Sequence, residues 1–319
     1  MLTELTCYVY TVYIMVYENY KKSPLFWNGL VNLVLSIVFL AFWLIDNRTL
    51  LGVPIWVKPI KFTISLLFYS WTSMWILIVF LNKWKYKNAI EWSLTITAVI
   101  EIVLISIQAM RGVSSHFNIS TPLNMAIFSI MGISISLFWL FHLWILIKIY
   151  RENSIDSFTK RILGYGLGIS AFGMIIGFFM TLPKPDQVQM MEKGVLYLSG
   201  SHSFGGPDGG AGISFFGWNK EYGDMRIAHF FGMHAMQIFT VLAVLNKDSV
   251  KQSNKLLIDT LGVVTFTITL LLTVQALMGL SLFLWNSFFS TFLIGLSLIF
   301  IIIFGTLLMT SFKFRSKTV

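Results

Sequence analysis

The chain has 319 residues, of which 56% are hydrophobic and 12% are charged. A soluble domain typically carries about 25% charged residues, so this composition excludes a soluble enzyme or a DNA-binding domain. The net charge of +9 does not change that conclusion, because Lys and Arg lie in short loops between apolar segments, as is typical of membrane proteins. The single cysteine, Cys7, also excludes an internal disulfide and a metal site made only of thiolates.

The first 20 residues precede the long apolar segments. They contain Glu4 and only a short apolar stretch, which does not match a cleavable signal peptide. Tyr8, Tyr10, Tyr13 and Tyr17 indicate a segment that lies at the membrane surface, because tyrosine is enriched at the membrane–water interface. A short additional span is the alternative.

Eight apolar segments follow, most of them of the length that a helix needs to cross a bilayer, about 20 residues. We predict spans at residues 25–44, 60–82, 91–111, 124–147, 161–182, 226–246, 257–282 and 288–311. The predicted fold is an all-α integral membrane protein with eight transmembrane helices in one transmembrane domain, residues 1–319. Of the 23 Lys and Arg residues, 15 fall on the side of the two termini, so both termini are expected in the cytoplasm.

One connection is much longer than the others. Residues 183–225 form a loop on the predicted outer side, and the stretch from Gly200 to Gly212 is too glycine-rich for the interior of a helix or strand. Long loops in compact proteins are usually functional or disordered. We expect this loop to fold over the mouth of the bundle, with His202 and Asp208 reaching inward. A flexible connector is the alternative.

Two short strings recur at nearly the same offset. Gln108-Ala-Met-Arg-Gly112 matches Gln275-Ala-Leu-Met-Gly279, 167 positions later, and Lys58-Pro-Ile-Lys-Phe62 matches Arg226-Ile-Ala-His-Phe230, 168 positions later. The offsets predict a 4+4 tandem duplication with half-repeats 25–150 and 160–312 and an inserted outer loop, 183–225. Short apolar strings also recur by chance, which is the alternative.

The unusual polar residues collect in the predicted outer half of the bundle, and Glu101 is the most informative of them. It lies near the middle of the third span, where a carboxylate is costly unless it is paired, protonated or hydrated. Gln108 and Arg111 continue the same helix face toward His116. This stripe predicts a proton relay or a ligand pocket. The predicted catalytic residues are Glu101 and Arg111 of the stripe and Asp208 of the long loop. The alternative is a hydrogen bond or ion pair that locks two helices.

The start of the sixth span carries two histidines. At 100° per residue, His229 shares a face with Arg226, whereas His234 points about 140° away and lies nearest Gln237. The two histidines therefore cannot hold one ion as an i,i+4 pair does, and each needs a partner from another element. The predicted metal-ligand set is His116, His202, His229 and His234.

Three kinds of cofactor compete for these side chains. Haem is held between histidines, and Lys or Arg can pair with its propionates; the predicted cofactor-binding set is Lys58, Lys61, Gln108, Arg226, Gln237 and Gln275. Zinc bound by His116, His202, His229 and Asp208 would activate water for hydrolysis. Copper on Met225, His229, Met233 and Met236 is the third reading, although such a methionine stripe more often fills a core.

Four strings resemble those of an uncharacterised family of bacterial multi-pass membrane proteins. They begin at Trp56 (Trp-Val-Lys-Pro-Ile-Lys-Phe), Gln108 (Gln-Ala-Met-Arg-Gly-Val-Ser-Ser-His-Phe-Asn), Gly205 (Gly-Gly-Pro-Asp-Gly-Gly) and Arg226 (Arg-Ile-Ala-His-Phe-Phe-Gly-Met-His-Ala-Met-Gln). The resemblance runs from about Asp46 to Gln275 and implies a bacterial plasma membrane. In architecture alone the chain is similar to haem A synthase. That family carries histidines on spans two, four, six and eight and a Glu-x-x-His motif, whereas spans two and eight here have no histidine and the motif is absent.

The sequence thus predicts a multi-pass protein of the bacterial plasma (inner) membrane with an outward-facing site of His, Arg and acidic residues. The expected partners are the lipid bilayer and an anionic small molecule or cofactor, and no nucleic acid. The leading prediction is that the site binds haem, another redox cofactor or a divalent metal. The alternatives are a zinc-dependent hydrolase acting at the outer leaflet and a proton-coupled transporter that uses Glu101. Whether the protein is an enzyme does not follow from the sequence.

Overall fold

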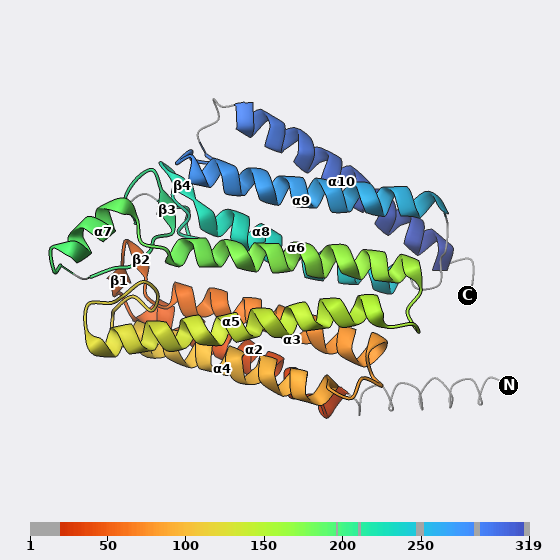
Figure 1. Ribbon diagram of the computed structural model, residues 1–319, viewed down its shortest axis with the longest axis horizontal. Coiled ribbons are helices and arrows are strands. Elements are labelled where there is room, and N and C mark those ends of the chain that lie inside the picture. The colour runs from red at the N-terminus through yellow and green to blue at the C-terminus, as the bar shows by residue number, and fades with distance from the viewer. Residues whose placement is uncertain (1–19, 196, 210–211, 247–251, 284–287, 316–319) are drawn as a thin grey trace.

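The computed structural model describes residues 20–195, 197–209, 212–246, 252–283 and 288–315 (Figure 1). Eight long helices are present: α2 (Pro24–Ile45), α3 (Val57–Phe80), α4 (Lys87–Met110), α5 (Pro122–Arg151), α6 (Ser157–Thr181), α8 (Met225–Asn246), α9 (Gln252–Leu277) and α10 (Phe288–Arg315). All eight are long and apolar enough to cross a membrane. The predicted all-α class with eight candidate spans is confirmed. The predicted interfacial segment lies almost wholly outside the described residues.

The helix boundaries follow local chemistry. Pro24 and Pro122 stand in the first turn of α2 and α5, where the missing N–H of proline costs nothing. Asp156 caps α6 by accepting the backbone N–H groups of Phe158 and Thr159 at 3.0 and 2.9 Å. The seventh span ends at Leu277 instead of residue 282, because Gly279 takes a left-handed φ of 73° that stops the helix.

Four very short strands and one short helix lie in the connections. Strand β1 (Thr49–Leu50) pairs antiparallel with β2 (Val53–Pro54), and β3 (Ser203–Phe204) pairs antiparallel with β4 (Gly223–Asp224). Helix α7 (Pro185–Glu192) opens the long loop. Although β3 lies inside the glycine-rich stretch, it has two residues and therefore no interior. The sequence indicated neither α7 nor the strands.

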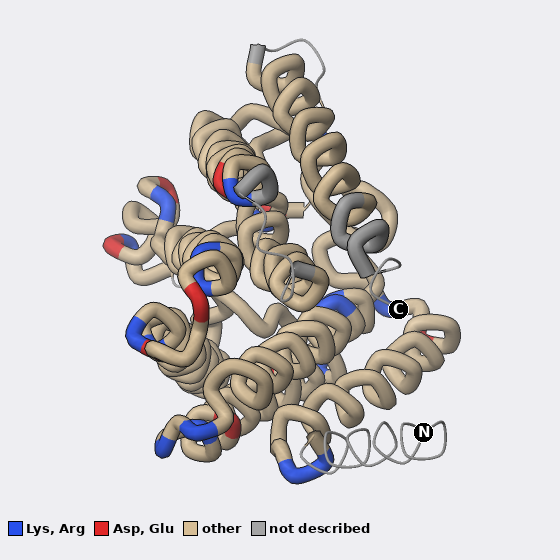
Figure 2. The backbone as a smooth tube through the Cα atoms, turned by 90° about the vertical axis from the view of Figure 1, so that its right-hand side faces the viewer, with Lys and Arg blue, Asp and Glu red and all other residues tan. Residues whose placement is uncertain are grey.

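The helices form two groups that follow each other in the chain. In the first group α2 packs on α3 and α4, and α4 packs on α5; in the second, α6 packs on α8 and α9, and α9 packs on α10. The groups meet through α5 with α6 and through α3 with α8. Figure 1 shows β1 to β4 and α7 at one end of the bundle, and the start of α2 and the end of α10 at the other. Viewed from this second end, most Lys and Arg lie near helix ends (Figure 2).

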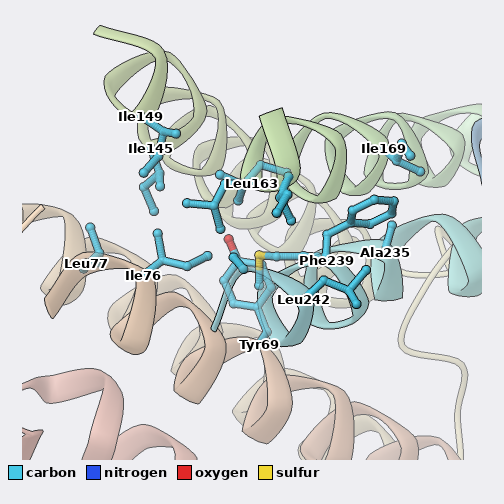
Figure 3. Packing of buried hydrophobic residues seen from close by; sticks show 14 of the residues in the cluster. Tyr69, Ile76, Leu77, Ile145, Ile149, Leu163, Ile169, Ala235, Phe239 and Leu242 are labelled. Atoms are coloured by element: carbon cyan, nitrogen blue, oxygen red, sulfur yellow. The ribbon is translucent and has the colours of Figure 1, made fainter. Parts of the chain in front are cut away.

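The core runs between the two groups at the middle of the bundle (Figure 3). Ile76 of α3, Ile145 of α5, Leu163 of α6 and Phe239 of α8 are fully or almost fully buried in one cluster. At the α6–α8 crossing, a Cβ on Gly173 would lie 2.6 Å from the backbone carbon of Gly232. Glycine at these positions therefore lets the backbones of α6 and α8 approach closely.

His142 of α5 belongs to this core and not to the outer site. Its Nδ1 lies 2.9 Å from the Tyr69 hydroxyl, and its Nε2 lies 2.9 Å from the Leu167 carbonyl. Both ring nitrogens are thus hydrogen-bonded, and the ring joins α3, α5 and α6. His142 therefore has a structural role, as a hydrogen-bonded link between three helices.

Candidate functional site

The candidate site lies where the first turns of α3 and α8 face each other, at the end of the bundle that carries the short strands. Lys58 and Lys61 come from α3, and Arg226 and His229 come from α8. The loop after α4 contributes His116, and the long loop contributes His202 and Asp208. Lys58 lies within electrostatic reach of Lys61, Arg226, Glu101 and Asp208. Residues that are far apart in the sequence therefore converge here.

Two half-buried lysines form the most unusual part of the site. The Lys58 ammonium lies 3.1 Å from Nδ1 of His116, and the Lys61 ammonium donates to the Phe216 carbonyl at 2.8 Å. Among the described residues no carboxylate lies within ion-pair distance of either lysine. An ammonium group has three donors, so each lysine keeps donors and a positive charge that neutral acceptors do not balance.

Arg226, in contrast, is already neutralised. Its Nε donates to Asp224 at 2.9 Å, and its Nη2 donates both to Asp224 and to the Gly217 carbonyl. Asp224 is 3% exposed, so this is a buried, hydrogen-bonded pair that anchors the long loop to α8. Arg226 was predicted as a counter-ion for a ligand, but its charge is compensated within the protein.

Glu101 lies on α4, 3% exposed, facing the site. Its Oε1 atom is buried and has no hydrogen-bond partner among the described residues. The positive charge within its electrostatic reach is that of Lys58. A buried carboxylate that lacks hydrogen bonds is costly, which distinguishes Glu101 from a stably paired structural carboxylate.

His116 is oriented by Lys58. An ammonium group can only donate, so Nδ1 of His116 accepts, and the neutral ring carries its proton on Nε2. Burial lowers the pKa of His116 well below its ordinary value, and the charges of Lys58, His202 and His229 lower it further. His116 is therefore a neutral donor whose Nδ1 is already in use, and this tautomer offers no free lone pair to a metal.

His202 and Asp208 form a pair inside the long loop. Nδ1 of His202 lies 3.2 Å from the Asp208 carboxylate, which also accepts the Ser201 hydroxyl at 2.8 Å and the backbone N–H groups of His202 and Ser203 at 2.9 and 2.6 Å. Burial lowers the pKa of His202 to about 4, although Asp208 acts to raise it. Burial acts to raise the pKa of Asp208. The hydrogen bonds to the carboxylate outweigh this effect, so the pKa of Asp208 lies well below its usual range.

Four donors thus surround the Asp208 carboxylate and fix the turn from residue 201 to 203. Asp208 was predicted as a catalytic residue. Its contacts make it a residue that positions His202, since the carboxylate holds the Nδ1 proton and leaves Nε2 as the lone-pair nitrogen.

His229, like His202, carries its proton on Nδ1, but a backbone carbonyl instead of a carboxylate accepts it. Its Nδ1 donates to the Gly173 carbonyl of α6 at 2.7 Å, so the neutral ring presents the Nε2 lone pair. The ring packs against Gly177, where an added Cβ would lie 3.2 Å from Cε1. A backbone carbonyl on the second nitrogen is the usual support of a metal-ligating histidine.

His234 points elsewhere, as the helical geometry predicts. Its ring packs edge-on to Phe230 with centroids 4.3 Å apart. Its Nε2 and the Oε1 of Gln237 are buried atoms without a hydrogen-bond partner among the described residues. The two residues lie on a different face of α8 from His229.

Three other predicted site residues belong to helix ends. Arg111 donates to the Asn124 amide oxygen at 3.0 Å and also hydrogen-bonds Gln108, whose Nε2 donates to Asn124 at 3.2 Å. This network joins the end of α4 to the start of α5. Gln275 donates to the Ser281 carbonyl at 3.1 Å beyond the end of α9. The stripe predicted from Glu101 to Arg111 is therefore divided, and only Glu101 faces the lysines.

The metal readings receive limited geometric support. Within the described ranges, no group of three or more His, Cys, Asp or Glu side chains is placed to hold a metal ion. Met225 and Met236 are buried in two core clusters, which favours the core-filling alternative for the methionine stripe. Comparison of the chain with protein-family models, curated proteins and solved structures gives no match, so the site is interpreted from its own geometry.

Several groups that shape the site have no signal in the sequence. The carbonyls of Phe216, Gly217 and Gly173 accept from Lys61, Arg226 and His229. Any residue type supplies a carbonyl, so only the fold reveals these acceptors. The Asp224–Arg226 spacing is the one visible hint, because residues two apart at a helix start can form a cap and an ion pair together.

Proposed function

We propose that this multi-pass membrane protein binds an anionic cofactor at the strand-bearing end of the bundle, with haem as the first candidate. The observation that carries the proposal is the pair Lys58 and Lys61, two half-buried ammonium groups without a carboxylate partner in the described chain. A buried charge is costly unless it is paired. A ligand with acid groups would supply the missing anions and form charge-assisted hydrogen bonds.

His229 supplies a reason to prefer a cofactor that also needs a nitrogen ligand. Its Nδ1 is held by the Gly173 carbonyl, so its Nε2 is the atom free to ligate an iron. Histidine is a common axial ligand of haem iron, and the tautomer is set by the hydrogen bond on the other nitrogen. Bound haem would bring redox chemistry; the chain itself would hold the propionates with Lys58 and Lys61 and the iron with His229.

A tandem duplication accounts for the placement of these residues. Gly112 and Gly279 have φ of 69° and 73°. Backbone bonds run from Val113 to Gln108 and from Leu280 to Gln275 at 3.0 and 3.1 Å. The two halves share the order helix, two-stranded sheet, helix, helix, helix, with α7 inserted before the sheet of the second half. The helix contacts of the first half recur in the second, where α8 also contacts α10. We infer two half-repeats, in which Lys58 corresponds to Arg226 and Lys61 to His229.

A second candidate is a proton-coupled carrier. It is favoured by Glu101, which has a buried oxygen without a partner and lies within electrostatic reach of Lys58. Protonation of Glu101 would remove one negative charge beside the lysines and so strengthen their hold on an anion. The zinc hydrolase has less support, because it requires at least three converging ligands. A bacterial plasma-membrane location, which rests on the resemblance of the motifs, is part of the proposal.

The test is a titration of detergent-purified protein with haem and with the haem dimethyl ester, which lacks the two carboxylates. We expect haem to bind with a shift of its absorbance spectrum, and the ester to bind at least tenfold more weakly, because each hydrogen bond to a charged group contributes about 1.5–3 kcal/mol. Equal affinity for the two compounds, or no spectral shift with either, would contradict the proposed role of the lysines.

A further inference from the structure

A separate pocket lies at the opposite end of the bundle, where α5 ends and α6 begins. It has a volume of about 470 Å³ and is lined by Tyr150, Ser157, Lys160, Arg161, Gly164 and Tyr165. These residues belong to the end of α5 and the first turns of α6, which both lie on the right in Figure 1. The positive-inside pattern assigns this end to the cytoplasm. None of these residues takes part in the site described above.

The pocket carries more positive than negative charge. Arg161 pairs with Asp259 of α9, with an Nη1–Oδ2 distance of 2.7 Å, and the Tyr165 hydroxyl donates to the same carboxylate at 3.2 Å. Lys160 donates only to the backbone carbonyl of Tyr150, at 3.2 Å. One of its three N–H donors is therefore used, and its charge faces the pocket without a carboxylate partner among the described residues.

The surroundings place the pocket at the boundary of the membrane. Tyr150 and Tyr165 line it, and tyrosine is enriched at the level of lipid headgroups. Leu256 and Val263 lie one turn before and one turn after Asp259 on α9 and are 72% and 58% exposed. An exposed apolar surface therefore runs away from the pocket along the same helix face.

We propose that this pocket binds the headgroup of an anionic phospholipid. The phosphate would accept hydrogen bonds from Lys160 and from the Tyr150 hydroxyl, because the Tyr165 hydroxyl already donates to Asp259, and the acyl chains would lie on the apolar face of α9. Basic pockets between transmembrane helices on the cytoplasmic side bind anionic headgroups by this combination of contacts. The exposed leucine and valine favour a lipid over free phosphate, because a free ion would leave that apolar face unused.

Gly164 sets the shape of the pocket. A Cβ at this position would lie 2.0 Å from the Tyr150 hydroxyl and 2.7 Å from its ring carbon Cζ. Glycine therefore allows the tyrosine to lie directly against α6. Gly164→Ala displaces Tyr150 while leaving every charge in place, which separates the shape of the site from its charge.

Lipid retention measured by native mass spectrometry tests this proposal. The protein is equilibrated with equal amounts of phosphatidylglycerol and phosphatidylcholine, whose acyl chains are matched. We expect preferential retention of phosphatidylglycerol, at least a fivefold loss of that preference in Lys160→Ala, and recovery in Lys160→Arg. Lys83→Ala is the matched control, because Lys83 is an exposed lysine near the same end outside the pocket. Gly164→Ala should lower retention with the charge unchanged.

Three results would overturn the proposal. Equal retention of the two lipids would remove the role of the headgroup charge. An equal loss in Lys83→Ala and Lys160→Ala would show a general surface attraction instead of a pocket. Displacement of the lipid by millimolar inorganic phosphate would assign the site to a free anion. Thermal unfolding of each variant in phosphatidylcholine shows whether the fold is intact. If Lys160→Ala fails to fold, Lys160→Gln replaces it, because glutamine also removes the charge.

Discussion

The ammonium of Lys58 lies 3.1 Å from Nδ1 of His116. Because an ammonium group can only donate, this contact fixes the tautomer of the imidazole. It leaves Lys58 without a carboxylate at ion-pair distance among the described residues. The lysine comes from the first turn of α3 and the histidine from the loop after α4. The contact thus joins two elements at the point where we propose that an anion binds.

Replacing Lys58 should weaken binding of an acidic ligand. In Lys58→Met the apolar stem remains and the charge is lost, so affinity for haem should fall at least tenfold, while affinity for the haem dimethyl ester should change little. Absorbance titration measures both. The control is Lys193→Met, because Lys193 is an exposed lysine in the long loop. A parallel loss for haem and its ester in Lys58→Met would show that the lysine acts through the fold and not through the acid groups.

The two histidines of α8 should behave differently. His229→Ala removes the Nε2 that the Gly173 carbonyl orients and should abolish the absorbance band of a ligated haem iron. His234→Ala should retain the band, because His234 lies on another face of the helix. Gly177→Ala gives an intermediate case, since the added Cβ would contact the His229 ring at 3.2 Å. Loss of the band in His234→Ala alone would reverse the assignment.

Glu101 and Glu91 form a matched pair of buried carboxylates on α4. Glu91 accepts from Lys87 at 3.1 Å, whereas Oε1 of Glu101 has no hydrogen-bond partner in the described part of the chain. We expect Glu91→Gln to lower the thermal unfolding temperature in detergent and Glu101→Gln to leave it unchanged or raise it, because the amide removes a costly buried acid. A large drop in Glu101→Gln would instead indicate the structural hydrogen bond or ion pair that the sequence left as the alternative.

Asp208 should hold the long loop in place. Asp208→Asn removes acceptor capacity from a carboxylate that four donors of residues 201–203 contact. Loss of such bonds costs about 1–3 kcal/mol for each group left unsatisfied, so limited proteolysis between residues 200 and 224 should accelerate. The exposed Asp186→Asn in α7 is the control. Unchanged proteolysis in Asp208→Asn would mean that other contacts fix the loop.

Acidification should loosen the same loop. The pKa of His202 is about 4 in the folded protein because of burial, against an ordinary value of about 6.5. The undocked loop therefore binds more protons than the docked loop, so docking is strongest above pH 6.5 and weakens as the pH falls toward 4. Asp208, with its lowered pKa, keeps its charge through this window. Amide hydrogen exchange at pH 7 and pH 5 measures the effect, corrected for intrinsic exchange rates. His202→Gln should abolish it; the same pH dependence in His202→Gln would contradict the assignment.

The spans could be predicted closely from the sequence, because each is a long apolar run that only a membrane helix accommodates. The boundaries of the helices were harder to predict. The end of α9 at Leu277 depends on the backbone conformation of Gly279, and the composition does not show whether a glycine adopts φ above zero. Helix α7 was missed because its sequence, Pro185 to Glu192, is polar and lies in a loop.

The grouping of residues at the candidate site could be predicted in part. Clustering of polar residues at one end placed Lys58, Lys61, Glu101, His116 and His202 in a common region, because polar side chains in or beside apolar spans are visible in the sequence. Which of them meet was not visible. Gln108 and Arg111 share a helix face with Glu101, yet they bond to Asn124 of α5. Helix periodicity gives the direction of a side chain but not the neighbour it faces, and tertiary packing decides the latter.

The most direct measurement is the iron and porphyrin content of protein purified from bacterial membranes in detergent without chelators. The account predicts roughly one iron and one porphyrin per chain, lost together in Lys58→Met and in His229→Ala and retained in Lys193→Met. A chain that carries neither, and that gives no spectral shift when haem is added, would contradict the cofactor proposal and leave the proton-coupled carrier built on Glu101.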